Sequence, residues 1–182
     1  MDASVLSLTD SMAISGSMHI SVLTAGGTID KIYFDELSTF QVGDPQISEV
    51  LKQVHAAFSY DVRVVLRKDS LELGEEDRAA VREAVQAATS SHVLVTHGTD
   101  TMCETGRALL GIEGKTIVLT GALTPARFRE SDAVFNIGFA LASVQILPPG
   151  VYVAMNGRVF DPVTTRKNRE RNTFESIEAG PE

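Results

Sequence analysis

Short apolar runs alternate with longer amphipathic segments from residue 19 onward, and this alternation is the main structural signal in the sequence. Strands are predicted where apolar, β-branched residues form continuous runs of five or six positions, a pattern typical of strands buried on both faces. The predicted strands cover residues 19–24, 61–66, 92–96, 115–120 and 151–155. Because these runs are separated by helical patterns, they favour a parallel sheet.

Helices are predicted between the strands, where apolar residues recur every three or four positions. They cover residues 47–58, 75–88, 101–110 and 131–146. In the last of these helices we expect four side chains to point inward, namely Phe135, Phe139, Leu141 and Ile146. The stretch from Asp30 to Gly43 is expected to be an irregular loop.

The order of these elements predicts a single α/β domain with a doubly wound, mainly parallel sheet and helices on both faces. We place this domain at residues 19–172. Residues 1–18 contain no Lys or Arg, which a secretory signal would need, and are interpreted as a disordered extension. Residues 173–182 are interpreted as an acidic tail.

Composition narrows the classes of partner. The chain is 43% apolar and 22% charged, with a net charge of −8, which argues against binding to nucleic acid or to an acidic membrane surface. Its apolar runs are too short to span a bilayer. The single cysteine, Cys103, excludes an intrachain disulfide and a cysteine-based zinc site, so it is interpreted as a buried thiol. We expect a cytoplasmic protein with no metal and no cofactor.

Polar residues follow the carboxyl ends of the predicted strands, where parallel sheets bind their ligands. Thr28 follows the first strand, Asp69 and Ser70 follow the second, Thr99 and Asp100 follow the third, and Lys167 comes after the fifth. A threonine hydroxyl becomes a nucleophile when a base removes its proton, and a second hydroxyl can relay that proton to a lysine. Such a set fits acyl transfer with ammonia as the leaving group.

Several segments resemble the motifs of bacterial-type L-asparaginases. They are Ala25-Gly26-Gly27-Thr28-Ile29, the THGTDTM run at residues 96–102, residues 161–167, and Ser70. The THGTDT run is highly specific, and the resemblance extends from about His19 to about Lys167. It implies a fold like the N-terminal domain of that family and hydrolysis of L-asparagine to aspartate and ammonia, with some activity on L-glutamine.

The resemblance also implies roles for individual residues. Thr28 is the expected nucleophile, Tyr33 its activator, Thr99 the second threonine, and Lys167 the lysine that supports Thr99. Asp100 is expected to bind the α-ammonium of a small amino-acid substrate and to polarise Lys167, while Ser70 binds the α-carboxylate. The expected substrate-binding set is completed by Gly27, Asp69 and Gly98.

Three departures from the family pattern stand out. Ala25 occupies a position where the family usually has threonine, and the loop around Tyr33 does not match the usual mobile loop closely. The sequence also ends where the family continues into a smaller second domain, so we expect a short, single-domain form. An open sheet rim would gain closure from a second copy, which predicts a homodimer or homotetramer.

Simpler interpretations exist for several of these residues. Thr28, Thr99 or Asp100 taken singly could cap a helix, although capping does not account for the whole set. His97 is interpreted as a neutral side chain bonded to the backbone, and residues 166–171, apart from Lys167, as a solvated basic face. A catalytically weak binding or regulatory module is the alternative function. A dinucleotide-binding domain is disfavoured because no G-x-G-x-x-G follows the first strand.

Overall fold

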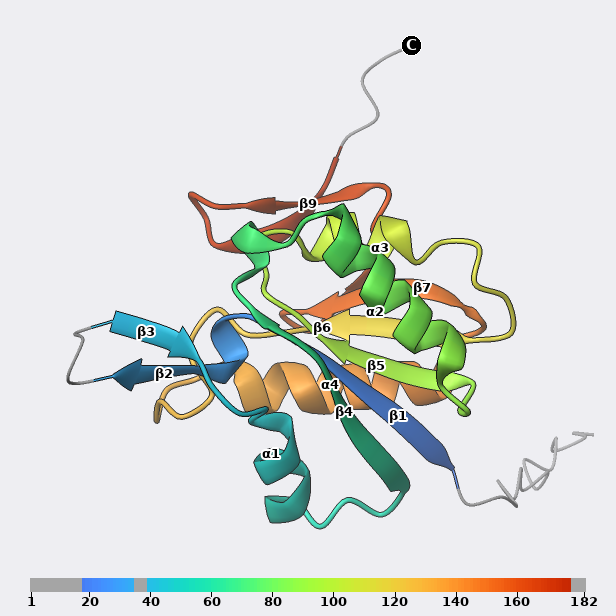
Figure 1. The fold of residues 1–182 in the computed structure, drawn as a ribbon, viewed down its shortest axis with the longest axis horizontal. Helices are drawn as coiled ribbons and strands as arrows, with labels where there is room; N and C mark the ends of the chain where they lie inside the picture. Colours follow the sequence, from blue (N-terminus) through green and yellow to red (C-terminus); the bar gives the residue numbers. More distant parts are fainter. Residues whose placement is uncertain (1–17, 35–38, 178–182) are drawn as a thin grey trace, which may run out of the picture.

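The computed structural model describes residues 18–34 and 39–177. Its centre is a six-stranded sheet in the order β4-β1-β5-β6-β7-β8 (Figure 1). The strands are β1 (His19–Gly26), β4 (Ser59–Lys68), β5 (His92–Thr96), β6 (Thr116–Thr120), β7 (Gly150–Met155) and β8 (Arg158–Phe160). All neighbours are parallel except β7 and β8. The predicted fold class is therefore confirmed.

Helices cover both faces of this sheet. Helices α2 (Glu75–Ala87) and α3 (Met102–Ala108) pack on one face, and α1 (Ile47–Gln53) and α4 (Ala133–Ile146) lie on the other (Figure 1). Alternate residues of the strands supply the two cores, with Leu23 facing α2 and α3, and Val22 facing α1 and α4. Strands such as β5 and β6 are buried on both faces, which explains their continuous apolar runs.

Two helices differ from the prediction. The first ends at Gln53, so Phe58 lies outside it and packs against the core from the following segment. In α4, Phe135 and Ile146 are exposed rather than inward, at 62% and 79%. The helix carries no charged residue, so its hydrophobicity does not identify the inner face. That face is set by the close packing of smaller side chains such as Ala133 and Ala140.

Three hairpins within the described residues were not predicted. The first is formed by β7 and β8, which pair across the two-residue turn Asn156-Gly157. Strands β2 (Lys31–Phe34) and β3 (Thr39–Val42) pair where an irregular loop was expected. Strands β9 (Thr165–Asn168) and β10 (Thr173–Ser176) pair near the end of the described chain. The β10 residues were assigned to the acidic tail, yet Phe174 is buried in the core that faces α3. Of the expected extension at 1–18, residues 1–17 lie outside the described residues, as do the last residues of the expected tail. Met18 is described, packs against the core and accepts a hydrogen bond from the Ser59 amide.

Candidate active site

The strand order places the loops after β1 and β5 side by side at the carboxyl edge of the sheet. Within this sheet, β4 is the next strand in sequence after β1 and lies on one side of β1, whereas β5 and the later strands lie on the other side. The chain therefore changes direction between these two strands, and such a switch point is where ligands of open α/β sheets bind. A Cβ atom added to Gly27 would lie 2.3 Å from Cα of Gly98. This contact brings the backbones before Thr28 and Thr99 together.

A glycine is needed at position 27 because of its backbone conformation as well as this contact. Its φ angle is +95°, in the left-handed region that side chains disfavour. Its amide donates a hydrogen bond to the carbonyl of Lys68, at the end of β4. The ends of β1, β4 and β5 thus meet at Gly27. Thr28, the next residue, begins a short 3₁₀ turn (Thr28–Asp30).

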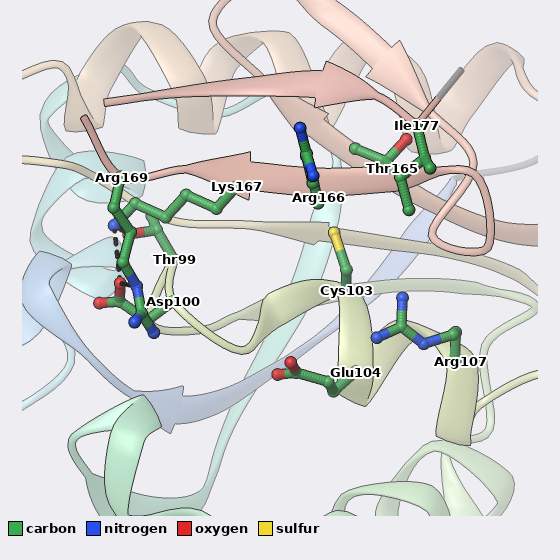
Figure 2. Close-up of a pocket in the computed structure, with 10 residues that line it drawn as sticks. All are labelled: Thr99, Asp100, Cys103, Glu104, Arg107, Thr165, Arg166, Lys167, Arg169 and Ile177. Atoms are coloured by element: carbon green, nitrogen blue, oxygen red, sulfur yellow. Dashed lines mark hydrogen bonds and ion pairs between the residues drawn. The ribbon is translucent and has the colours of Figure 1, made fainter. Parts of the chain in front are cut away.

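Thr99, Asp100 and Lys167 form a hydrogen-bonded group at this edge. The Lys167 Nζ lies 2.7 Å from Thr99 Oγ1 and 3.2 Å from Asp100 Oδ1 (Figure 2). Thr99 is 3% exposed, and the Lys167 side chain is 11% exposed. The structure therefore brings together these three residues, which the sequence placed at the carboxyl edge, with the ammonium held between a hydroxyl and a carboxylate.

Ser70 lies against the same glycines. It is 2% exposed, and it begins a second 3₁₀ turn, Ser70–Glu72. The Thr101 hydroxyl donates a 2.7 Å hydrogen bond to the Ser70 carbonyl, which fastens the loop after β4 to the loop after β5. A Cβ on Gly98 would lie 2.5 Å from Cβ and Oγ of Ser70. The Ser70 side chain is therefore in direct contact with the backbone that leads to Thr99.

Asp69 supports this turn rather than standing free. Its carboxylate accepts a hydrogen bond from the Leu71 amide and forms an ion pair of 2.6 Å with Lys31 Nζ. Burial alone would raise the pKa of Asp69, but these two hydrogen bonds hold it below the ordinary value. Because Lys31 begins β2, Asp69 also ties the β2–β3 hairpin to the site.

The structure does not join Thr28 or Tyr33 to the hydrogen-bonded group of Thr99, Asp100 and Lys167. Thr28 is half-buried and is not among the residues that line the cavity beside Lys167. Tyr33 lies on β2 two residues beyond Lys31, and its side chain lies outside the described part of the structure. The roles predicted for both residues therefore stay predictions.

A cavity of about 400 Å³ lies between α3 and the β9–β10 hairpin. Figure 2 shows Thr99, Asp100, Lys167 and Arg169 gathered at one end of it, whereas Cys103 and Arg107 reach it from α3. Its remaining lining residues are Glu104, Thr165, Arg166 and Ile177. The hydrogen-bonded group of Lys167 is thus open to a small molecule on this side.

Arg169 was missed by the sequence interpretation, which treated it as part of a solvated face. Its side chain is 66% exposed, as expected, but its Nε lies 3.1 Å from Asp100 Oδ1. Lys167 lies on β9, whereas Arg169 is the first residue of the turn that follows it, and both reach Asp100. Because Asp100 is far away in the sequence, no local pattern indicated that Arg169 would pair with it.

Asp30 is a second residue that the sequence interpretation missed. Its carboxylate is 2% exposed and accepts a 2.8 Å hydrogen bond from the Gln46 amide. Burial raises the pKa of Asp30 to about 6, although the Gln46 bond and the charge of Arg67 oppose the shift. Since Asp30 ends the turn that begins at Thr28, it connects that turn to the start of α1.

Two further groups near the site are not arranged as a base or a nucleophile. His97 is fully buried, bonded to the Gly98 carbonyl and to the Thr105 hydroxyl, and burial lowers its pKa to about 4. This confirms the prediction of a neutral, backbone-bonded histidine. Cys103 is 7% exposed, and burial raises its pKa to about 11, which confirms a buried thiol.

The contact between Gly98 and Ser70 leads to a first prediction. Gly98→Ala is expected to lower the free energy of unfolding by about 1–3 kcal/mol, because the added methyl overlaps a buried side chain. Denaturant unfolding would measure this. Gly138→Ala is the control, since a Cβ at this exposed position of α4 meets no atom within 4 Å and should be neutral or stabilising. Equal effects of the two substitutions would contradict the proposed contact.

The described residues contain no group of three or more His, Cys, Asp or Glu side chains that could hold a metal ion. None of the helices within these ranges combines the length and apolar character that crossing a membrane requires.

The chain was compared with known protein families, curated proteins and solved structures. A family model described as "Asparaginase, N-terminal" matches residues 19–182. The L-asparaginase of Thermococcus kodakarensis is 30% identical over 174 residues, covering 88% of this chain and 51% of that protein. A component of the glutamyl-tRNA(Gln) amidotransferase of Thermoplasma acidophilum is 28% identical, covering 91% of this chain and 44% of that protein.

The solved structure of the thermostable L-asparaginase from Thermococcus kodakarensis has a similar fold. It matches with a TM-score of 0.74 at 26% sequence identity, over 87% of this chain and 51% of that chain. The chain thus spans about half the length of the curated relatives it matches.

Proposed function

Because the chain belongs to the asparaginase family, matching its N-terminal domain, we propose that it hydrolyses the side-chain amide of L-asparagine through a threonine nucleophile. The observation that carries this proposal is the contact of 2.7 Å between Lys167 Nζ and the buried Thr99 hydroxyl, with Asp100 on the same ammonium. An amine and a hydroxyl paired in this way serve proton transfer during acyl transfer.

In the proposed reaction the Thr28 oxygen attacks the amide carbon, and its proton passes through neighbouring groups to the departing ammonia. An ester between Thr28 and the aspartyl group forms, and water then hydrolyses it to aspartate. Tyr33 is proposed to activate Thr28, and Thr99 with Lys167 to relay and stabilise charge. The proposal draws support from the contact between Gly27 and Gly98, which brings the backbones before the two threonines together.

Substrate binding is proposed to use the residues that surround these glycines. Asp100 would bind the α-ammonium and Ser70 the α-carboxylate. Asp69, Gly27 and Gly98 would shape the pocket, since Asp69 holds the Ser70 turn and the glycines allow close approach of the backbone. Some activity on L-glutamine is also proposed, and the rates of ammonia release from L-asparagine and L-glutamine in one assay would test it.

The test is release of ammonia and formation of aspartate when the purified chain is incubated with L-asparagine. Heat-inactivated protein serves as the blank, and L-glutamine serves as the longer amide. We expect steady release from L-asparagine. If the chain binds L-aspartate but releases no ammonia from either amide, the proposed hydrolysis is wrong.

That second outcome would favour the alternative function, a binding or regulatory module with this fold. One observation supports this alternative, because Thr28 is absent from the lining of the cavity beside Lys167. A bound L-aspartate without turnover would mean that Thr99, Asp100 and Lys167 recognise an amino acid but do not work with Thr28.

We also propose that copies of the chain form a homodimer or homotetramer. Support comes from the exposed, uncharged face of α4, which includes Val134, Phe135 and Ile146. Light scattering tests this directly, and a fully active monomer would contradict it. The cytoplasmic location inferred from the sequence stays a prediction.

A further inference from the structure

Asp100 already binds two cations. Lys167 Nζ lies 3.2 Å and Arg169 Nε lies 3.1 Å from the same oxygen, Oδ1. The proposed function assigns this carboxylate to the α-ammonium of the substrate. A third cation that approaches Asp100 therefore meets a carboxylate whose charge is already balanced, and it is repelled by the two cations beside it.

The two cations differ in how firmly they are held. Lys167 is largely buried and also donates a hydrogen bond to Thr99, so it stays in place when Asp100 changes partner. Arg169 follows β9, and its side chain is 66% exposed. An exposed ion pair is weak and readily exchanged. Arg169 is therefore the cation that competes with an incoming ammonium for Asp100.

The cavity next to Asp100 is lined by more positive than negative side chains. Four of its lining side chains are cationic, namely Arg107, Arg166, Lys167 and Arg169, and two are acidic, Asp100 and Glu104. This excess of positive charge occurs in a chain with a net charge of −8. These cations lie on the side of Asp100 that faces the cavity, so they add a cost for each positive charge that a ligand brings to this carboxylate.

We propose that Arg169 is a specificity-determining residue, which weakens recognition of the α-ammonium and so widens the substrate class. The amides favoured by this arrangement are half-amides of short dicarboxylic acids without an ammonium, of which succinamate is the simplest. This inference rests on the proposed function, because it assumes that ligands place their amino group at Asp100. Removal of the guanidinium should shift preference toward ligands with an ammonium.

The test compares two product-like probes that differ only in the ammonium, L-aspartate and succinate. Their dissociation constants are measured by titration calorimetry with the wild-type chain, Arg169→Gln and Arg171→Gln. Arg171 is a matched control because it is an exposed arginine in the same hairpin turn, two residues from Arg169. Binding is measured rather than turnover, so the result does not depend on catalysis.

We expect Arg169→Gln to lower the ratio of the L-aspartate constant to the succinate constant by about two- to fivefold. Arg171→Gln should leave the ratio at the wild-type value. High salt should narrow the difference between wild type and Arg169→Gln, because it screens exposed charges. A merely structural effect of Arg169 would change both dissociation constants together and leave the ratio as it was.

Two results would overturn the inference. If both probes bind and Arg169→Gln leaves their ratio unchanged, the specificity role is rejected while the amino-acid site of the proposed function stands. If neither probe binds any of the three proteins, the proposed substrate site and the role of Arg169 are rejected together.

Discussion

Thr28→Ala and Lys167→Met are each expected to slow ammonia release from L-asparagine by at least about a hundredfold, the range typical of a lost proton-transfer group. Thr28→Ala removes the proposed nucleophile. Lys167→Met keeps a chain of similar length but removes the ammonium that lies 2.7 Å from Thr99 Oγ1. Initial rates at saturating substrate, with circular dichroism to check the fold, measure both effects.

Two matched variants control for this prediction. Thr28→Ser keeps a hydroxyl at the reacting position and should retain measurable activity. Lys52→Met removes a lysine from the exposed surface of α1, where it pairs with Glu49, and should hydrolyse asparagine at the wild-type rate. A Lys167→Met protein that is folded and as fast as wild type would exclude Lys167 from the chemistry.

The second large effect concerns stability and Asp30. At neutral pH the folded chain carries a buried carboxylate whose pKa is raised by burial from 3.8 to about 6. A shift of two units corresponds to about 3 kcal/mol. Because the folded pKa is above the unfolded one, the stability linked to Asp30 is present below pH 4 and is lost as pH rises to 6. At pH 7.5, Asp30→Asn should therefore have a higher free energy of unfolding than wild type, by up to about 3 kcal/mol, which denaturant unfolding would measure.

His97 acts in the opposite direction over the same pH range. Burial lowers its pKa from 6.5 to about 4, so the unfolded chain binds this proton more readily. Stability linked to His97 is present above pH 6.5 and is lost as pH falls to 4. In the wild type the contributions of Asp30 and His97 oppose each other in this window. In Asp30→Asn the His97 contribution is unopposed, so its stability should fall more steeply than that of wild type between pH 6 and pH 4.

Asp161→Asn is the control for this experiment. Asp161 also accepts a backbone hydrogen bond, from Val163 at 2.7 Å, but it is exposed. Its substitution should give a stability difference that changes little with pH. The prediction fails if the difference between Asp30→Asn and wild type is the same at pH 4 and pH 7.5.

The sequence by itself determined five of the six strands of the central sheet, its covering helices and the family. Continuous apolar runs identified β5 and β6, which are buried on both faces because helices cover the sheet above and below. The run in β4 also identified a strand, but β4 lies at the edge of the sheet and has no buried residue. Thr99, Asp100 and Lys167 were found for a related reason, since the carboxyl ends of parallel strands share one edge, although Lys167 reaches that edge from β9 rather than from a loop. The structure then brought these three within hydrogen-bond distance.

Only the tertiary structure decided which polar groups are buried and which cations pair. Asp30 reads as an ordinary loop aspartate, because its raised pKa comes from burial beneath packing that the sequence does not display. The inner face of α4 was mispredicted because a helix without charges has no sequence signal for orientation. Arg169 looked solvated because its partner, Asp100, lies 69 positions away in the chain. Burial and long-range pairing depend on how distant segments meet, and that is decided by the packed fold.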